Sequence, residues 1–119
     1  MKLYTNTQLL NIFERYISAM NTPEEPQKLY APIKYGLEEG GKRIRPTLLM
    51  LAYNLYADDI ERALMPAMAV EIFHNFTLLH DDIMDNAAVR RGRPSVPAKW
   101  GDNVAILSGD AMLILAYSY

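Results

Sequence analysis

The stretch HNFTLLHDDIMD, from His74 to Asp85, decides how the rest of the chain is interpreted. It closes a long apolar pattern that begins near Asp59, keeps helical spacing and contains no glycine, so a long helix is predicted here. Only Pro66 interrupts the pattern, either as a first-turn residue of a later start or as a kink. Its end holds three carboxylates within five residues, those of Asp81, Asp82 and Asp85. Like charges repel, and a helix dipole is negative at its carboxyl end, so a cation is expected among these aspartates.

Helical geometry places an imidazole and two of these carboxylates on one face. Seven residues nearly complete two turns, so His74 and Asp81 point the same way, and Asp85 lies within about 40° of them. The chain has no cysteine, and a set of oxygen donors favours a hard cation. Mg²⁺ binds through one or two carboxylates and leaves room for water and phosphate, so magnesium is the expected metal.

Two basic stretches flank this helix in the sequence. The first reads GGKRIRP from Gly40 to Pro46, and the second is RRGR from Arg90 to Arg93. The first stretch has two interpretations: a glycine helix cap followed by a solvated basic turn, or a cradle in which backbone N–H groups and cations bind phosphate. Arginines close to an aspartate cluster favour an anion that shares the site with the metal.

The remaining apolar residues also keep the helical period. Helices are predicted from Thr7 to Met20, from Pro23 after a Thr22 cap to about Glu38, from Arg43 to Tyr56, and from Asn103 to the last residue. Residues 86–97 have turn formers and no period, which indicates a loop, and no strand is convincing. An all-α helical bundle is therefore expected. Asp110 is the one charge inside the last helix, and we expect it to be buried beside a hydroxyl or a cation.

Composition narrows the classes of function. The 119 residues carry a net charge of −2, which gives no broad basic surface for nucleic acid. No uncharged apolar run reaches the roughly 18 to 20 residues that a membrane span needs. The absence of cysteine, together with a first stretch that does not resemble a secretory signal, leads us to expect a cytoplasmic protein.

Five motifs occur in the order and spacing of the trans-prenyltransferases, the polyprenyl diphosphate synthases: Gly40 to Pro46, His74, the aspartates from Asp81 to Asp85, Arg90 to Gly92, and Gly109-Asp110. The resemblance runs from about Lys34 to the end. It implies an isoprenoid-synthase-type helical bundle and a Mg²⁺-dependent enzyme. Such an enzyme condenses isopentenyl diphosphate with an allylic diphosphate by metal-assisted ionisation.

The resemblance also implies a role for each motif residue. Asp81 and Asp85 would be metal ligands supported by Asp82, and Arg90 would contact the allylic diphosphate. Isopentenyl diphosphate would be held by Lys42, Arg45, His74 and Arg91. The family controls product length just before the aspartates, at Phe73, Phe76 and Thr77 here. An aromatic Phe76 resembles short-chain synthases with farnesyl or geranylgeranyl products, although these aromatics are equally compatible with an ordinary core.

Family members carry a second aspartate-rich motif, and this sequence has none. We therefore interpret residues 1–119 as the N-terminal portion of one domain, inactive alone and part of a homodimer in the whole protein. Two alternatives remain. A non-catalytic partner subunit or prenyl-diphosphate-binding protein of the same family would not need intact Asp81, Asp85 and Arg90. A terpene cyclase or squalene-type synthase would lack the stretch from Gly40 to Pro46.

Overall fold

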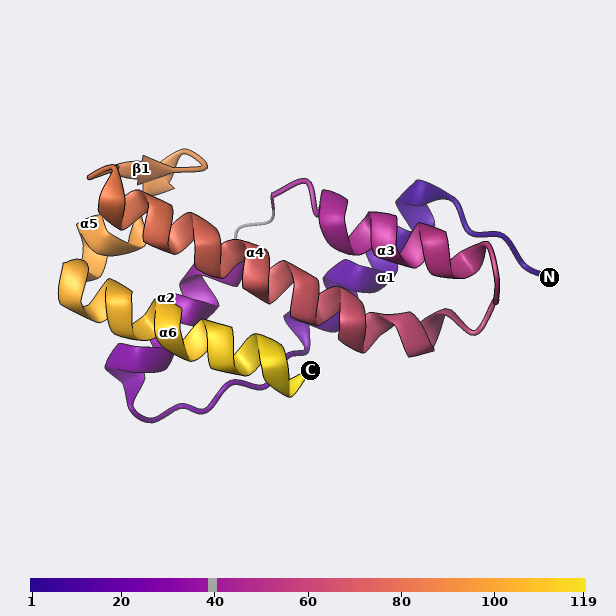
Figure 1. The fold of residues 1–119 in the computed structure, drawn as a ribbon, viewed down its shortest axis with the longest axis horizontal. Helices are drawn as coiled ribbons and strands as arrows, with labels where there is room; N and C mark the ends of the chain where they lie inside the picture. The colour runs from indigo at the N-terminus through magenta and orange to yellow at the C-terminus, as the bar shows by residue number, and fades with distance from the viewer. Residues whose placement is uncertain (39–40) are drawn as a thin grey trace.

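Helix α4, Leu64–Met84, is the axis of the bundle in the computed structural model, which describes residues 1–38 and 41–119 (Figure 1). Figure 1 shows α6, Asp102–Ser118, lying along one side of α4, with α3, Ile44–Asn54, on the other. Helix α2, Gln27–Glu38, packs on α6, and α1, Asn6–Ser18, packs on α3. Buried apolar side chains from all five helices join in one core cluster. The predicted all-α helical bundle is confirmed.

Helix α1 follows its predicted pattern. Its buried residues Leu9, Phe13 and Ile17 are spaced by four, so they form one stripe that faces the core. Thr5 caps the helix, because its side chain accepts from the Gln8 backbone while the Gln8 side chain accepts from the Thr5 backbone N–H. This reciprocal pair fixes the start of the bundle.

Helix α2 begins later than the sequence suggested. A start at Pro23 was wrong, because the first helical residue is Gln27. The carbonyl of Pro26 accepts from the backbone N–H groups of Leu29 and Tyr30, so the helical hydrogen bonds begin there. A residue that precedes proline is disfavoured in helical conformation, which excludes Glu25 from the helix.

The predicted start of the long helix near Asp59 was wrong, and the later start with Pro66 in the first turn is the observed one. Residues Ile60–Ala63 form a separate short 3-10 helix, η1, and α4 begins at Leu64. Pro66 is the third residue of α4, so it occupies the first turn, where proline removes no helical hydrogen bond. The long helix therefore continues uninterrupted to Met84, and its last turns carry the aspartates.

Residues 86–97, predicted as a loop without strands, contain a small hairpin. Strand β1, Val89–Arg90, pairs antiparallel with β2, Arg93–Pro94. Both turn residues have positive φ, 55° at Arg91 and 79° at Gly92, as tight two-residue hairpins require. The end of this segment is helical too, since α5, Val96–Trp100, starts behind a Ser95 cap.

Helices α4 and α6 approach closely at Gly109. A Cβ atom there would lie 2.4 Å from Nε2 of His80, so only glycine fits without displacement. Asp110 next to it was expected to be buried, and this was wrong. Its side chain is 60% exposed and lies 3.8 Å from the same His80 Nε2. No helix in the described part of the chain combines the length and apolar character needed to cross a membrane.

Candidate functional site

The start of α3, the middle of α4 and the hairpin line a pocket of about 280 Å³, in whose wall several cations surround the acid Glu71. The four residues that the resemblance assigned to isopentenyl diphosphate all line this pocket: Lys42, Arg45, His74 and Arg91. Arg90 lines it as well. Gly41 also lines it, whereas Gly40 of the same motif lies outside the described residues. Cations from two distant basic stretches therefore converge on one concave surface, the basic pocket.

Arg45 and His74 form a direct contact within the basic pocket. Nη1 of Arg45 lies 3.3 Å from Nε2 of His74. Because arginine has only donors, Arg45 donates and the imidazole accepts, which requires a neutral ring. Burial, followed by the charge of Arg45, lowers the pKa of His74 from its ordinary value. An anion placed between them would reverse this preference and favour the charged ring.

Arg91 reaches the basic pocket from the hairpin turn. Its guanidinium lies against Gly41, where an added Cβ would come within 2.9 Å of Nη2. Burial, and after it the charge of Arg43, lowers the pKa of Arg91. A bound anion beside this guanidinium would favour its charged form.

Arg43 was counted in the sequence only as one of three neighbouring cations. The residue borders the basic pocket, but its guanidinium is taken up by partners inside the protein. Its side chain is 1% exposed, and its φ of 51° lies in the left-handed region. The guanidinium donates to Glu14, Glu71 and the carbonyl oxygen of Leu37. The three cations look alike in the sequence, so their directions could not be predicted from residue type. The one hint was an acid, Glu71, on the helix face that carries His74.

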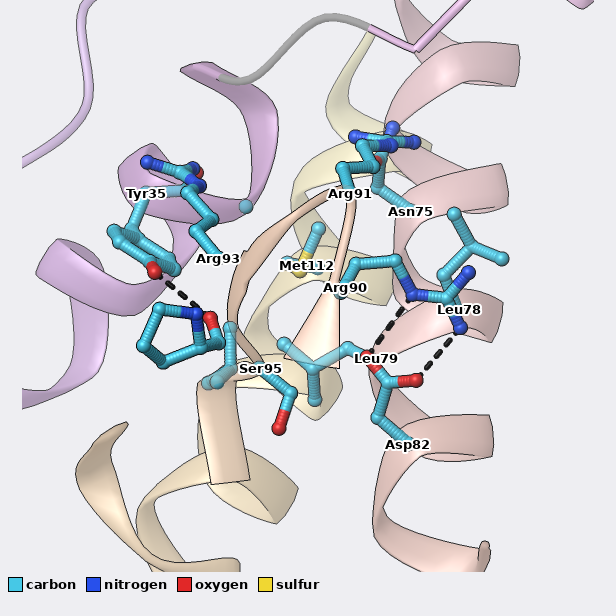
Figure 2. Close-up of a pocket in the computed structure, with 13 residues that line it drawn as sticks. Tyr35, Asn75, Leu78, Leu79, Asp82, Arg90, Arg91, Arg93, Ser95 and Met112 are labelled. Atoms are coloured by element: carbon cyan, nitrogen blue, oxygen red, sulfur yellow. Dashed lines mark hydrogen bonds and ion pairs between the residues drawn. The ribbon is translucent and has the colours of Figure 1, made fainter. Parts of the chain in front are cut away.

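The three clustered aspartates are not equivalent. The side chain of Asp82 is only 6% exposed, and both of its oxygens accept from Arg90, over 2.6 Å and 3.1 Å. Figure 2 shows this pair beside the hairpin, with Arg91 turned toward Asn75 above it. The hydrogen bond to Asp82 is the main cause of the raised pKa of Arg90.

Asp81 and Asp85 are exposed at the last turn of α4. Both carboxylates also help to raise the pKa of Arg90, so they lie within electrostatic reach of the basic pocket. Among residues 1–38 and 41–119 no group of three or more acidic or histidine side chains gathers as a metal site. Two open carboxylates fit Mg²⁺, because that ion takes the rest of its ligands from water and phosphate.

The hairpin is anchored on its far side by an aromatic residue. Arg93 lies 3.6 Å above the Tyr35 ring and donates to the Tyr35 carbonyl oxygen, while the Tyr35 hydroxyl donates to the Pro94 carbonyl oxygen over 2.8 Å (Figure 2). These contacts tie β2 to α2. They were not anticipated, because Tyr35 lies 59 residues from Pro94 in the sequence.

The residues assigned to product length stack along α4. The rings of Phe73 and Phe76 are 5.7 Å apart, and Phe76 lies 4.6 Å from the His80 ring. Phe73 is 45% exposed, which is unusual for an ordinary core aromatic. The hydroxyl of Thr77 donates to the His74 carbonyl oxygen within the same helix.

The sequence of this chain is similar to those of known proteins. The sequence profile of the family described as polyprenyl synthetase matches residues 26–119. A short chain isoprenyl diphosphate synthase of Methanocaldococcus jannaschii is 46% identical over 108 residues, which are 90% of this chain and 33% of the relative. A geranylgeranyl diphosphate synthase of Methanosarcina mazei is 47% identical over 92 residues, or 77% of this chain and 28% of the relative.

Solved structures agree with the sequence matches. A crystal structure of a geranylgeranyl pyrophosphate synthase superposes with a TM-score of 0.93 at 47% identity, covering 98% of this chain and 36% of that one. A geranyltranstransferase of Thermotoga maritima gives 0.84 at 36% identity, covering 97% of this chain and 44% of the other. The chain thus spans about a third of the length of the curated relatives named above.

Proposed function

Because the chain belongs to the polyprenyl synthetase family, we propose that it forms the diphosphate-binding part of a chain-elongating prenyltransferase. The reaction joins isopentenyl diphosphate to an allylic diphosphate. The observation that carries the proposal is the basic pocket itself, where Lys42, Arg45, His74 and Arg91 surround a space. Its wall also includes Arg90, which pairs with Asp82 between two exposed aspartates. A pocket for one diphosphate beside a carboxylate pair for a second matches the two substrates.

The basic pocket holds the diphosphate of the nucleophile. Lys42 and Arg45 supply exposed cations, and Arg91 supplies a third cation from the hairpin turn. Charge-assisted hydrogen bonds from guanidinium to phosphate are strong and directional. They fix isopentenyl diphosphate so that its double bond faces the reaction partner.

Asp81 and Asp85 would hold the magnesium that accompanies the allylic diphosphate. The chemistry that Mg²⁺ would supply there is neutralisation of the diphosphate, which would make it a better leaving group. Arg90 adds charge on the same side, and its pairing with Asp82 keeps it in place. No side chain has to act as a covalent nucleophile, since positioning and electrostatics account for the rate.

Short-chain products are part of the same proposal. The aromatic pair of Phe73 and Phe76 occupies the turns of α4 that precede the aspartates. A growing tail that runs along this face of α4 would meet Phe76 early. Farnesyl or geranylgeranyl diphosphate would follow, and relatives are named geranylgeranyl diphosphate synthases.

We further propose that the working enzyme is a cytoplasmic homodimer. Helix α6 exposes apolar side chains, with Leu107 61%, Ile114 72% and Tyr117 83% accessible, and such a surface favours association. Residues 1–119 alone provide one carboxylate pair, so they release little or no pyrophosphate by themselves.

The experiment incubates isopentenyl and dimethylallyl diphosphates with Mg²⁺ and either the full gene product or residues 1–119. Pyrophosphate release and product mass are measured. The full gene product is expected to give longer linear diphosphates, and residues 1–119 are expected to give none. Cyclic products would indicate a terpene cyclase, and no turnover by the full gene product would indicate a non-catalytic partner subunit.

A further inference from the structure

We propose that Arg43 is a positioning residue for the basic pocket: it sets where Lys42 and Arg45 stand without touching the ligand itself. The inference rests on the proposed function, because it concerns the same diphosphate site. It assigns a separate role to a cation that lies between two proposed ligand residues in the sequence and differs from them in being buried and ion-paired.

The backbone at Arg43 explains why its neighbours diverge from it. Arg43 is the residue before α3 and has left-handed angles, φ 51° and ψ 36°. A non-glycine residue in this region is strained and persists only where surrounding contacts hold it. The turn sends the Arg43 side chain into the protein, while Lys42 and Arg45 remain exposed at the pocket.

Three contacts hold this turn, and each comes from a different helix. Nε of Arg43 donates to Glu14 of α1 over 2.9 Å, and Nη1 donates to Glu71 of α4 over 2.9 Å. Nη2 donates to the carbonyl oxygen of Leu37, in the last turn of α2, over 2.7 Å. A planar guanidinium satisfies three such partners at once, which the single ammonium of lysine does not.

These contacts couple the basic pocket to the bundle. Glu71 lies one turn before His74 on α4, so the same guanidinium relates the turn before α3 to the helix that carries the imidazole. Because Glu71 is only 3% exposed, removing Arg43 would leave a buried unpaired carboxylate beside the pocket. An Arg43 variant would therefore change binding for two reasons at once, the loss of positioning and the unpaired negative charge of Glu71.

Glu14 separates the two effects. Its side chain is 39% exposed on α1, and it does not line the basic pocket. Glu14→Gln weakens one of the three contacts and removes a negative charge. Simple electrostatics predicts tighter binding of an anion after this change, whereas positioning through Arg43 predicts weaker binding. The sign of the change therefore distinguishes the two explanations.

The experiment measures binding of inorganic pyrophosphate by calorimetry to the full gene product, without divalent metal, so that only the basic pocket is probed. Glu14→Gln is expected to raise the dissociation constant about fivefold, because displacements well below 1 Å are costly at such sites. Glu61→Gln is the matched control, since it removes the same charge from an exposed acid in η1 and should leave binding unchanged. Thermal unfolding verifies that each variant is folded.

Two further variants make the outcomes decisive. In an Arg43→Met background, Glu14→Gln should have no additional effect, because the contact between Arg43 and Glu14 is already absent. Arg45→Gln reports on the pocket itself. If Arg45→Gln weakens binding but Glu14→Gln leaves it unchanged or tighter, the positioning role of Arg43 is wrong and the pocket stands. If Arg45→Gln binds as the wild type does, the diphosphate pocket is wrong and this inference falls with it.

Discussion

Arg90 donates to both carboxylate oxygens of Asp82, from Nη2 over 2.6 Å and from Nε over 3.1 Å. The pair fastens strand β1 to the last turns of α4, so the hairpin that carries Arg91 cannot shift without breaking it. It also divides the aspartate cluster, because Asp82 faces the hairpin while Asp81 and Asp85 remain exposed. A structural anchor and a candidate metal site thus alternate within five residues.

The division predicts unequal effects on stability. Asp82→Asn should lower the free energy of unfolding by about 2 kcal/mol, because it weakens two charge-assisted hydrogen bonds in a buried setting. Asp81→Asn removes the same charge from an exposed position and should change stability by less than about 0.5 kcal/mol. Urea unfolding of both variants measures the difference. Equal losses would show that Asp82 does not anchor the hairpin.

Two helical glycines should respond to alanine with opposite signs. A Cβ at Gly36 meets nothing within 4 Å, so Gly36→Ala should stabilise α2 by roughly 0.5 to 1 kcal/mol. A Cβ at Gly109 would clash with His80, so Gly109→Ala should destabilise by about 1 to 3 kcal/mol. Adding His80→Ala to Gly109→Ala should recover part of the loss. Thermal denaturation measures the stability of Gly36→Ala, Gly109→Ala and the double variant. A Gly109→Ala chain as stable as the wild type would contradict the close approach of α4 and α6.

The protonation of His74 should make stability depend on pH. Its pKa is lowered in the folded chain, by burial first and then by Arg45, whereas the unfolded chain has the ordinary value of 6.5. As the pH falls below 6.5, the unfolded state takes up a proton that the folded state does not, so stability is lost. The His74→Gln chain should therefore lose less stability between pH 7 and pH 5 than the wild type. Denaturant unfolding at both values tests this.

The same residue should report on ligand binding. A diphosphate in the basic pocket favours the charged imidazole, so added pyrophosphate should move the titration of the His74 ring, followed by NMR, to higher pH. His80 lies outside the lining of the pocket, and its ring signals should be unchanged. A titration of His74 that pyrophosphate does not alter would argue against its place in the diphosphate site.

The sequence predicted what depends on short-range periodicity. The apolar stripe of Leu9, Phe13 and Ile17 and the helix that carries the aspartates follow from spacing alone, and so does the all-α class. The hairpin was missed because its turn is Arg91-Gly92, in which only glycine carries the usual signal for positive φ. The start of α2 was missed because Pro23 was taken as the first residue of the helix, whereas the helix begins directly after Pro26.

Side-chain direction is the part of the site that a single sequence does not contain. Lys42, Arg43 and Arg45 are chemically similar, yet only Arg43 is buried. Hydrogen bonds to Glu14, Glu71 and the Leu37 carbonyl oxygen hold its side chain inside the protein. Asp110 shows the reverse error. An apolar helix suggested burial, but the residue faces outward from α6. Both outcomes depend on tertiary contacts, and the local sequence pattern carries no record of them.

Product length gives the last prediction. The Phe76 ring lies between those of Phe73 and His80, at 5.7 Å and 4.6 Å, on the turns that precede the aspartates. If Phe76 blocks the growing tail, Phe76→Ala in the full gene product should shift products by at least one isoprene unit, because the space of the ring becomes available to the chain. Mass spectrometry of the dephosphorylated products measures the shift. Phe13→Leu is the control, since it reduces an aromatic buried in the core on α1 and should alter stability without altering product length. A Phe76→Ala enzyme whose products are no longer than those of the wild type would assign this aromatic to packing alone.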